Sequence, residues 1–264
     1  MSRIHATALV ALRAELADDV SVGPYAVIGA DVRIGPGSSI GPHCVVEGHT
    51  TIGRDNRVFQ FASLGAVPQD KKYAGEPTSL EIGDRNTIRE FVTINTGTVQ
   101  DVGLTALGDD NWIMAYVHIA HDCQVGNQTI FANNSQLAGH VEVGDWVILG
   151  GFTVVHQFVR IGAHGMTAMC SLLFADQPPF VMSQGQPAQA RSMNYEGLRR
   201  RGFSSERIAV VKAMHKALYR EDLTLEQARQ RIATLDDGVP DCAADVRMMV
   251  EFLEKTSPQR GIVR

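Results

Sequence analysis

The chain has 264 residues, with 24 lysines and arginines against 29 aspartates and glutamates. An apolar fraction of 44% is enough for a packed core and excludes a disordered chain, while a net charge of −5 argues against non-specific binding to nucleic acid. The 25 glycines stand beside only 10 phenylalanines, 5 tyrosines and 2 tryptophans. Because large rings usually fill the core of a globular domain, this composition predicts a narrower core.

Targeting signals and cysteine pairs are missing from the sequence. No apolar run approaches the roughly 18 residues that a membrane span needs, and the first residues lack the apolar core of a signal peptide. We therefore expect a cytoplasmic protein without a membrane span. The four cysteines, which form no C-x-x-C pair, are expected to be reduced packing thiols rather than a disulfide or zinc framework: Cys44, Cys123, Cys170 and Cys242.

An aliphatic residue recurs every six positions from the start of the chain. The first run contains Ile4, Val10, Leu16, Val22, Ile28, Ile34, Ile40, Val46, Ile52, Val58 and Leu64. The pattern resumes at Ile82, Ile88 and Ile94, and returns one residue out of phase from Leu107 to Ile161. Six residues suit one short strand and one corner of a parallel β-helix, in which three sides close a coil of 18 residues. Residues i and i+18 should then stack about 4.8 Å apart.

Two insertions and a set of glycines accompany the repeat. The breaks in the repeat predict loops at about residues 65–80 and 96–106. Loops that interrupt so strict a repeat more often have a function than not. Glycine follows many anchors, for example at Gly23, Gly29 and Gly150. We expect these glycines to serve tight corners, where a missing Cβ helps the chain to turn.

From about residue 190 the period changes to that of helices. Ser204 precedes an apolar stripe typical of an amphipathic helix, Thr224 with Gln227 forms a capping box, and a third helix is expected over Ala243–Glu254. The sequence therefore predicts a β-helix domain at 1–189 and a small helical domain at 190–264 that caps the open end of the coil.

Four of the nine histidines fall within one stretch of the repeat: His118, His121, His140 and His156. The 18-residue register stacks His121 over Gly139 and Asp122 over His140, on one side of consecutive coils. None of the four histidines occupies one of the positions at which the repeat has its aliphatic residue, so their side chains should point away from the core. A single surface histidine is usually a solvated polar residue, but four in register beside a carboxylate favour a site. Such a histidine suits a general base, and a glycine N–H suits an oxyanion.

Several motifs resemble one family of acyltransferases along the whole chain. They are His118-Ile-Ala-His-Asp-Cys, Leu137-Ala-Gly-His, Val155-His-Gln-Phe, Asp70-Lys-Lys-Tyr-Ala-Gly-Glu-Pro, Asn194-Tyr-Glu-Gly-Leu-Arg-Arg-Arg-Gly-Phe and the terminal Arg260-Gly-Ile-Val-Arg. The family is that of the UDP-N-acetylglucosamine O-acyltransferases that begin lipid A synthesis. The resemblance implies a left-handed β-helix, although the usual crossover rule favours the right hand. It also implies a homotrimer that takes an (R)-3-hydroxyacyl group from acyl carrier protein, with no other cofactor, no metal and no acyl-enzyme.

The resemblance implies a role for each matching residue. His121 would be the general base, Asp122 would orient it, and the Gly139 N–H would stabilise the oxyanion. The residues implied to bind substrate are Gln69, Asp70, Lys72, His118, His140, His156, Gln157, Asn194, Glu196, Arg200 and Arg201. The arginines suit a diphosphate, although a solvated surface run is the common reading of a basic triplet.

Two positions bear on substrate details. Where the family has Thr-Ile-His-Arg-Gly-Thr, this chain has Thr93-Ile-Asn-Thr-Gly-Thr, which removes two polar side chains. Met169 matches the position that sets acyl length in the family, and its volume predicts a short chain of about ten carbons.

Other functions stay open on the sequence alone. A related glucosamine N-acyltransferase would need an additional N-terminal domain, whereas the repeat here begins at Ile4. An acetyl-CoA-dependent sugar acetyltransferase would share the repeat. A carbonic anhydrase with this repeat would bind zinc through three histidines. A purely structural β-helix would leave the aligned histidines unexplained.

Overall fold

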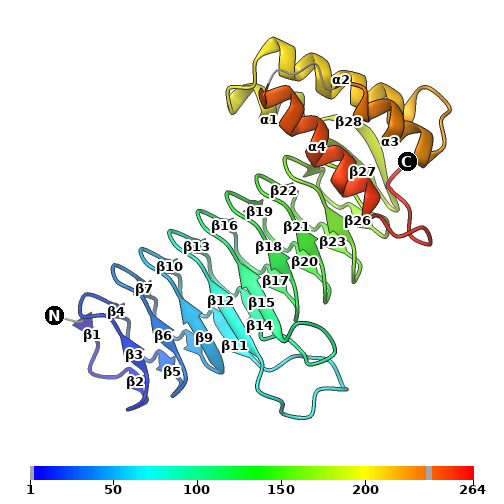
Figure 1. The fold of residues 1–264 in the computed structure, drawn as a ribbon. Helices are drawn as coiled ribbons and strands as arrows, with labels where there is room; N and C mark the ends of the chain where they lie inside the picture. The colour runs from blue at the N-terminus through cyan, green and yellow to red at the C-terminus, as the bar shows by residue number, and fades with distance from the viewer. Residues whose placement is uncertain (1–2, 236–239) are drawn as a thin grey trace.

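The computed structural model describes residues 3–235 and 240–264. The repeat winds into a prism whose three sides are sheets of parallel strands (Figure 1). The first sheet ends in an antiparallel hairpin, which lies with four helices at the C-terminal end of the prism. This arrangement confirms a parallel β-helix followed by a helical region. Within the described ranges, no helix is long and apolar enough to span a membrane.

Each side of the prism is one sheet, and successive strands of the chain belong to successive sides. The first sheet contains, in spatial order, β1 (Arg3–Ile4), β4 (Ser21–Val22), β7 (Ser39–Ile40), β10 (Arg57–Val58), β13 (Thr87–Ile88), β16 (Trp112–Ile113), β19 (Ile130–Phe131), β22 (Ile148–Leu149), β25 (Met166–Thr167), β27 (Val181–Gly185) and β28 (Ala188–Met193). The second contains β2 (Leu9–Val10), β5 (Val27–Ile28), β8 (Val45–Val46), β11 (Ser63–Ala66), β14 (Thr93–Asn95), β17 (His118–Ile119), β20 (Gln136–Leu137), β23 (Val154–Val155) and β26 (Leu172–Leu173). The third contains β24 (Arg160–Ile161), β21 (Glu142–Val143), β18 (Gln124–Val125), β15 (Leu104–Leu107), β12 (Ser79–Ile82), β9 (His49–Ile52), β6 (Arg33–Ile34) and β3 (Glu15–Leu16).

The strand register confirms the 18-residue coil around the histidines. His118 pairs with Gln136, and Gln136 pairs with Val154. The two insertions lie between β11 and β12 and between β14 and β15, which gives loops at 67–78 and 96–103. Both predicted loops are therefore present, each slightly shorter than expected because the flanking strands extend into it.

The narrow core explains the amino-acid composition. The buried core of the coil, over the described residues, contains a single aromatic ring, Phe131, among aliphatic side chains. Other rings stack on the outside, along the corner between the first two sheets, with neighbouring centroids 4.8–5.1 Å apart: Tyr25, His43, Phe61, Phe91 and Tyr116. The coil spacing thus brings rings together at a corner, while the interior has room for one branched aliphatic side chain per side.

The expected reason for the repeated glycines was wrong. These glycines are not the residues with positive φ; that conformation falls on later, non-glycine corner residues such as Tyr25 and Phe152. A Cβ on Gly23 would instead lie 2.8 Å from the backbone nitrogen of Pro42, and one on Gly150 would lie 2.6 Å from that of Met169. Glycine is required because the next coil passes too close, not because the chain turns there.

Polar side chains also repeat from coil to coil inside the prism. The backbone N–H and the side-chain N–H of Asn86 both donate to Asn56 Oδ1. Asn86 Oδ1 in turn accepts from the backbone N–H of Asn111. Asn111 Oδ1 then accepts from Thr129. Since these side chains are buried, this ladder satisfies backbone groups that the corner leaves without a sheet partner.

The C-terminal region has its own core. Helices α2 (Ser205–Tyr219), α3 (Leu225–Ala233) and α4 (Pro240–Glu254) pack together with the β27–β28 hairpin. Ser204 caps α2, and the predicted capping box opens α3. The hairpin and the short helix α1 (Tyr195–Arg200) were not predicted, and α4 begins three residues earlier than expected. The division of the chain at residue 190 stays a prediction.

The glycine explanation can be tested with two neighbouring residues. Gly150→Ala should lower the free energy of unfolding by about 2–4 kcal/mol, because its methyl would overlap the next coil's backbone. Gly151→Ala is the matched control, since its Cβ would meet nothing closer than Asn133 O at 3.4 Å. Urea unfolding measures both variants. Equal stability of the two would contradict the close-approach explanation.

Candidate active site

The candidate site lies at the corner between the second and third sheets. His118 points outward from β17, His121 and Asp122 form the corner that follows, and Gly139 and His140 form the next corner after β20. The backbone joins the two corners, because the His140 N–H donates to the His121 carbonyl at 3.0 Å. The register therefore brings together the residues that the sequence analysis grouped.

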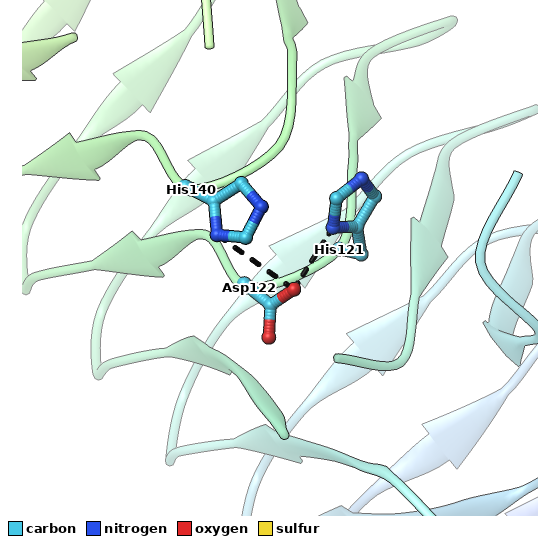
Figure 2. A group of neighbouring side chains, drawn as sticks. All are labelled: His121, Asp122 and His140. Carbon is cyan, nitrogen blue, oxygen red and sulfur yellow. Dashed lines mark hydrogen bonds and ion pairs between the residues drawn. The ribbon is translucent and has the colours of Figure 1, made fainter. Parts of the chain in front are cut away.

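His121 and Asp122 form a hydrogen-bonded pair (Figure 2). His121 Nδ1 lies 2.9 Å from Asp122 Oδ2, and the Asp122 side chain is fully buried, whereas that of His121 is 13% exposed. Asp122 has a φ of 60°, and its N–H donates to Thr105 Oγ1 at 2.8 Å. With its Nδ1–H donated to a buried carboxylate, the imidazole presents Nε2 as an acceptor, as a general base must.

Gly139 lies directly against the His121 ring. A Cβ at this glycine would be 2.4 Å from His121 Cε1, so the imidazole can occupy its place only because the side chain is missing. The Gly139 N–H donates no hydrogen bond to any residue of the described ranges, while its carbonyl accepts from the Phe158 N–H. A free N–H beside a candidate base is a suitable oxyanion donor.

The neighbouring histidines have partners of their own. His140 Nδ1 lies 2.7 Å from Asp101 Oδ2, and its ring stacks on Phe158 with centroids 4.3 Å apart. His118 Nδ1 lies 2.7 Å from Thr93 Oγ1. Burial lowers the pKa of His118, and a positive charge on the neighbouring His121 would lower it further, so the neutral imidazole is favoured at His118.

Three of these residues could hold a metal ion. His121, Asp122 and His140 each offer one ligand atom, and these atoms lie within 4.8 Å of one another (Figure 2). The Nδ1 atoms of both histidines already have a carboxylate partner, as the hydrogen bonds to Asp122 and Asp101 show. Hydrogen bonds to carboxylates therefore account for the positions of both histidine side chains.

The next coil brings His156 and Gln157 close to the site's edge. His156 Nδ1 lies 3.1 Å from its neighbour's carbonyl, Gln157 O, and its ring contacts Phe174. Both His156 and Gln157 are exposed. They continue the histidine side of the coil but make no hydrogen bond to His121 within the described part of the chain.

The remaining predicted binding residues lie apart from the histidines in one chain. Gln69, Asp70 and Lys72 are on the 67–78 loop, where Asp70 Oδ1 accepts from the Lys72 N–H. Met169 is exposed at a different corner, between β25 and β26. Among the described residues, no hydrogen bond or ion pair joins this loop or Met169 to the histidines.

The residues around α1 occupy the end of the coil. Asn194 caps α1 through the Gly197 N–H and is itself buried, with its side-chain N–H donating to His164 O. Arg200 forms an exposed ion pair with Glu196. Arg201 lies between two coil residues and donates to Trp146 O and His164 Nδ1, at 3.0 and 3.2 Å. In this chain Asn194 and Arg201 thus hold α1 onto the coil, while Glu196 and Arg200 face solvent.

A groove of about 760 Å³ lies elsewhere, between the third sheet and α4. Its lining includes Gln124, Glu142, Arg160, Arg247 and Phe252, but none of the four histidines. The histidine corner is therefore separate from this groove.

Sequence reasoning missed four residues that support the site. They are Thr93, Thr98, Asp101 and Thr105, each of which contacts a predicted site residue. All four come from the preceding coil or its loop. Part of the signal was present, because the Thr93–Thr98 segment departs from the family pattern; its Asn95 and Thr96 hydrogen bond to Ala66, Val67 and Thr78 at the ends of the first loop.

Comparisons with known families match both parts of the chain. A model described as bacterial transferase hexapeptide matches residues 13–48 and 105–139, and one described as UDP N-acetylglucosamine O-acyltransferase, domain 2, matches residues 176–263. The acyl-(acyl-carrier-protein)–UDP-N-acetylglucosamine O-acyltransferase of Albidiferax ferrireducens is 74% identical, with 100% of both chains covered.

Solved structures give the same result. The UDP-N-acetylglucosamine O-acyltransferase of Moraxella catarrhalis has a TM-score of 0.95 at 40% identity, covering 99% of this chain and 100% of its own. The UDP-N-acetylglucosamine acyltransferase of Francisella novicida has a TM-score of 0.94 at 37% identity, with 99% of this chain and 94% of its own covered. The fold and the site thus define a hexapeptide-repeat acyltransferase. Within that class, the chain belongs to the UDP-N-acetylglucosamine O-acyltransferase family.

His164, which lies where the end of α1 meets the coil, should make the stability of the protein depend on pH. His164 is buried between Trp146 and Phe180, and burial, followed by the charges of Arg201 and Arg207, lowers its pKa to about 4. The unfolded chain, with a histidine pKa of about 6.5, binds more protons between these values. The free energy of unfolding should therefore fall as pH drops from about 6.5 to 4, by up to about 3 kcal/mol.

Urea unfolding at pH 7.5 and pH 5 measures this loss. His164→Phe removes the titrating group while keeping a ring in the stack, so it should show a smaller loss than the unmodified chain. His43→Phe is the control, because His43 is an exposed member of another ring stack. The same loss in all three proteins would rule out His164 as its source.

Proposed function

We propose that the chain transfers an (R)-3-hydroxyacyl group from acyl carrier protein to the 3-hydroxyl of UDP-N-acetylglucosamine, the first step of lipid A biosynthesis. The observation that carries this proposal is the His121–Asp122 pair beside the Gly139 N–H, which has no hydrogen-bond partner among the described residues. It occurs in a chain that matches enzymes named for this reaction over their full length.

The geometry supports base catalysis of a direct attack. His121 Nε2 would take the proton of the sugar 3-hydroxyl as its oxygen attacks the thioester carbonyl, and Asp122 would stabilise the imidazolium. The Gly139 N–H would donate to the oxyanion of the tetrahedral intermediate. The imidazolium would then give its proton to the departing phosphopantetheine thiolate, which leaves the acyl group as an ester on the sugar.

An acyl-enzyme is not needed in this scheme. Cys123 is the thiol next to Asp122, but it is buried, and burial raises its pKa to about 12. A protonated thiol is a poor nucleophile. Direct transfer therefore requires fewer steps, and the acyl group arrives on the carrier protein without a further cofactor.

A homotrimer would complete the site. The 67–78 loop, Met169 and the α1 residues are separate from the histidines in one chain, yet the resemblance assigns all of them to substrate. Neighbouring subunits packed side by side would bring one chain's loop to another chain's histidines. We propose this assembly, a left-handed coil, the division near residue 190 and a cytoplasmic location on the strength of the family resemblance.

The proposed reaction is tested by incubating purified protein with UDP-N-acetylglucosamine and either 3-hydroxyacyl carrier protein or acetyl-CoA. We expect transfer from the carrier protein, unaffected by EDTA, and a loss of at least about 1,000-fold in His121→Ala. His49→Ala, at an exposed histidine of β9, should keep full activity. Transfer from acetyl-CoA alone would refute the proposal, and an EDTA-sensitive activity with stoichiometric zinc would favour a metal enzyme.

Acyl length provides a second test of the same reaction. Competing donors of different length should give a product with about ten acyl carbons, because the resemblance places Met169 at the end of the acyl groove, where its side chain would fill space. Met169→Gly should shift the product toward longer chains. Mass spectrometry of the products measures this, and a preference for a 14-carbon donor in the unmodified enzyme would contradict the assignment.

A further inference from the structure

The segment from Thr93 to Asp101 forms a layer behind the histidines. It comprises β14 and most of the 96–103 loop, and it lies one coil before the histidine corner. Thr93 contacts His118, Thr98 contacts Asp122, and Asp101 contacts His140. One short segment therefore supplies a partner to each of three neighbouring site residues.

Thr98 makes the most extensive of these contacts. Its N–H lies 2.9 Å from Asp122 Oδ1 and 3.0 Å from Oδ2, and its hydroxyl donates to Oδ2 at 2.6 Å. Thr98 is 1% exposed and the Asp122 side chain is fully buried. The carboxylate thus accepts from three groups at once: the Thr98 N–H, the Thr98 hydroxyl and His121 Nδ1–H.

The local backbone permits this approach because of one glycine. A Cβ on Gly97 would lie 2.2 Å from the Leu104 nitrogen and 2.8 Å from Asp122 Oδ1. Any other residue there would push the loop away from the carboxylate. The Thr98 carbonyl then accepts from the Asp101 N–H, which closes the turn that carries Asp101 to His140.

We propose that Thr98 is a positioning residue for acyl transfer: it fixes the Asp122 carboxylate, which in turn orients His121. This inference rests on the proposed function, since it assigns Thr98 a place behind the proposed base. A buried carboxylate with one imidazole partner could rotate about its χ2 angle, whereas donors on both oxygens hold it in one orientation. Charge-assisted hydrogen bonds are also the strong ones, and they are stronger still away from water.

The test removes the Thr98 hydroxyl and keeps the branched shape of its side chain. Thr98→Val should lower kcat about 10- to 100-fold with KM changed less than about threefold, because the lost hydrogen bond to a charge acts on the transition state rather than on substrate binding. Thr98→Ser, which restores the donor, should recover most of kcat. Thr129→Val is the matched control, since that buried hydroxyl donates to Asn111 instead.

A double-mutant cycle separates positioning from a general structural effect. If Thr98 acts through Asp122, then adding Thr98→Val to Asp122→Asn should lower kcat by less than about twofold further. Independent, multiplying losses would overturn the inference. So would an unchanged kcat in Thr98→Val, or no recovery in Thr98→Ser.

The proposed function and this inference fail in different ways. Absence of carrier-protein-dependent transfer in the unmodified chain, or full activity in His121→Ala, would refute the function itself. Active unmodified enzyme and inactive His121→Ala, together with normal kcat in Thr98→Val, would refute only the role of Thr98. If Thr98→Val does not fold, Thr98→Ala deletes the same hydroxyl, and its kcat is interpreted in the same way.

Discussion

The close parallel stacking of successive coils is the constraint on which the rest of the structure depends. Each coil hydrogen bonds to the next at the spacing of strands in a sheet, about 4.8 Å. Every position therefore meets its equivalent in the next coil. Aliphatic anchors fill the interior, glycines occur where the neighbouring backbone leaves no room for a Cβ, and Asn56, Asn86 and Asn111 form a ladder in register. The same stacking places His121 against Gly139.

A β-helix without insertions would limit which residues can meet at a site. In uninterrupted register, each corner residue meets the equivalent corners above and below it. The 96–103 loop breaks this limit, because it brings Thr98 and Asp101 from the preceding coil to the Asp122 and His140 corners. The repeat thus provides a rigid frame, and an insertion provides the contacts that are not periodic. Functional residues on rigid elements with a supporting layer are held more accurately than residues on loops alone.

The sequence predicted the periodic part of the molecule and little of the aperiodic part. The three sheets, both loops and the His121–Asp122–Gly139 grouping follow from a period of six. Thr98 and Asp101 did not follow, because the insertion shifts their register by an amount that the repeat does not encode. The helix α1 has six residues, too few for a clear helical period. The role of the glycines was misassigned because a tight corner and a close approach of the next coil both select glycine, so the sequence alone does not distinguish the two causes.

The two carboxylates beside the histidines differ in solvent exposure, and this difference determines how they can act. Asp122 is fully buried, whereas the Asp101 side chain is 41% exposed. Hydrogen bonds to a buried charge are weakly screened, while an exposed pair is weakened by water and salt. The pair that includes the proposed base is therefore the less screened of the two. His140 is held in another way, because its ring stacks on Phe158 in addition to its hydrogen bond to the exposed Asp101. A buried carboxylate behind the proposed base thus keeps the proton-accepting imidazole in one orientation, whatever the ionic strength around the neighbouring pair.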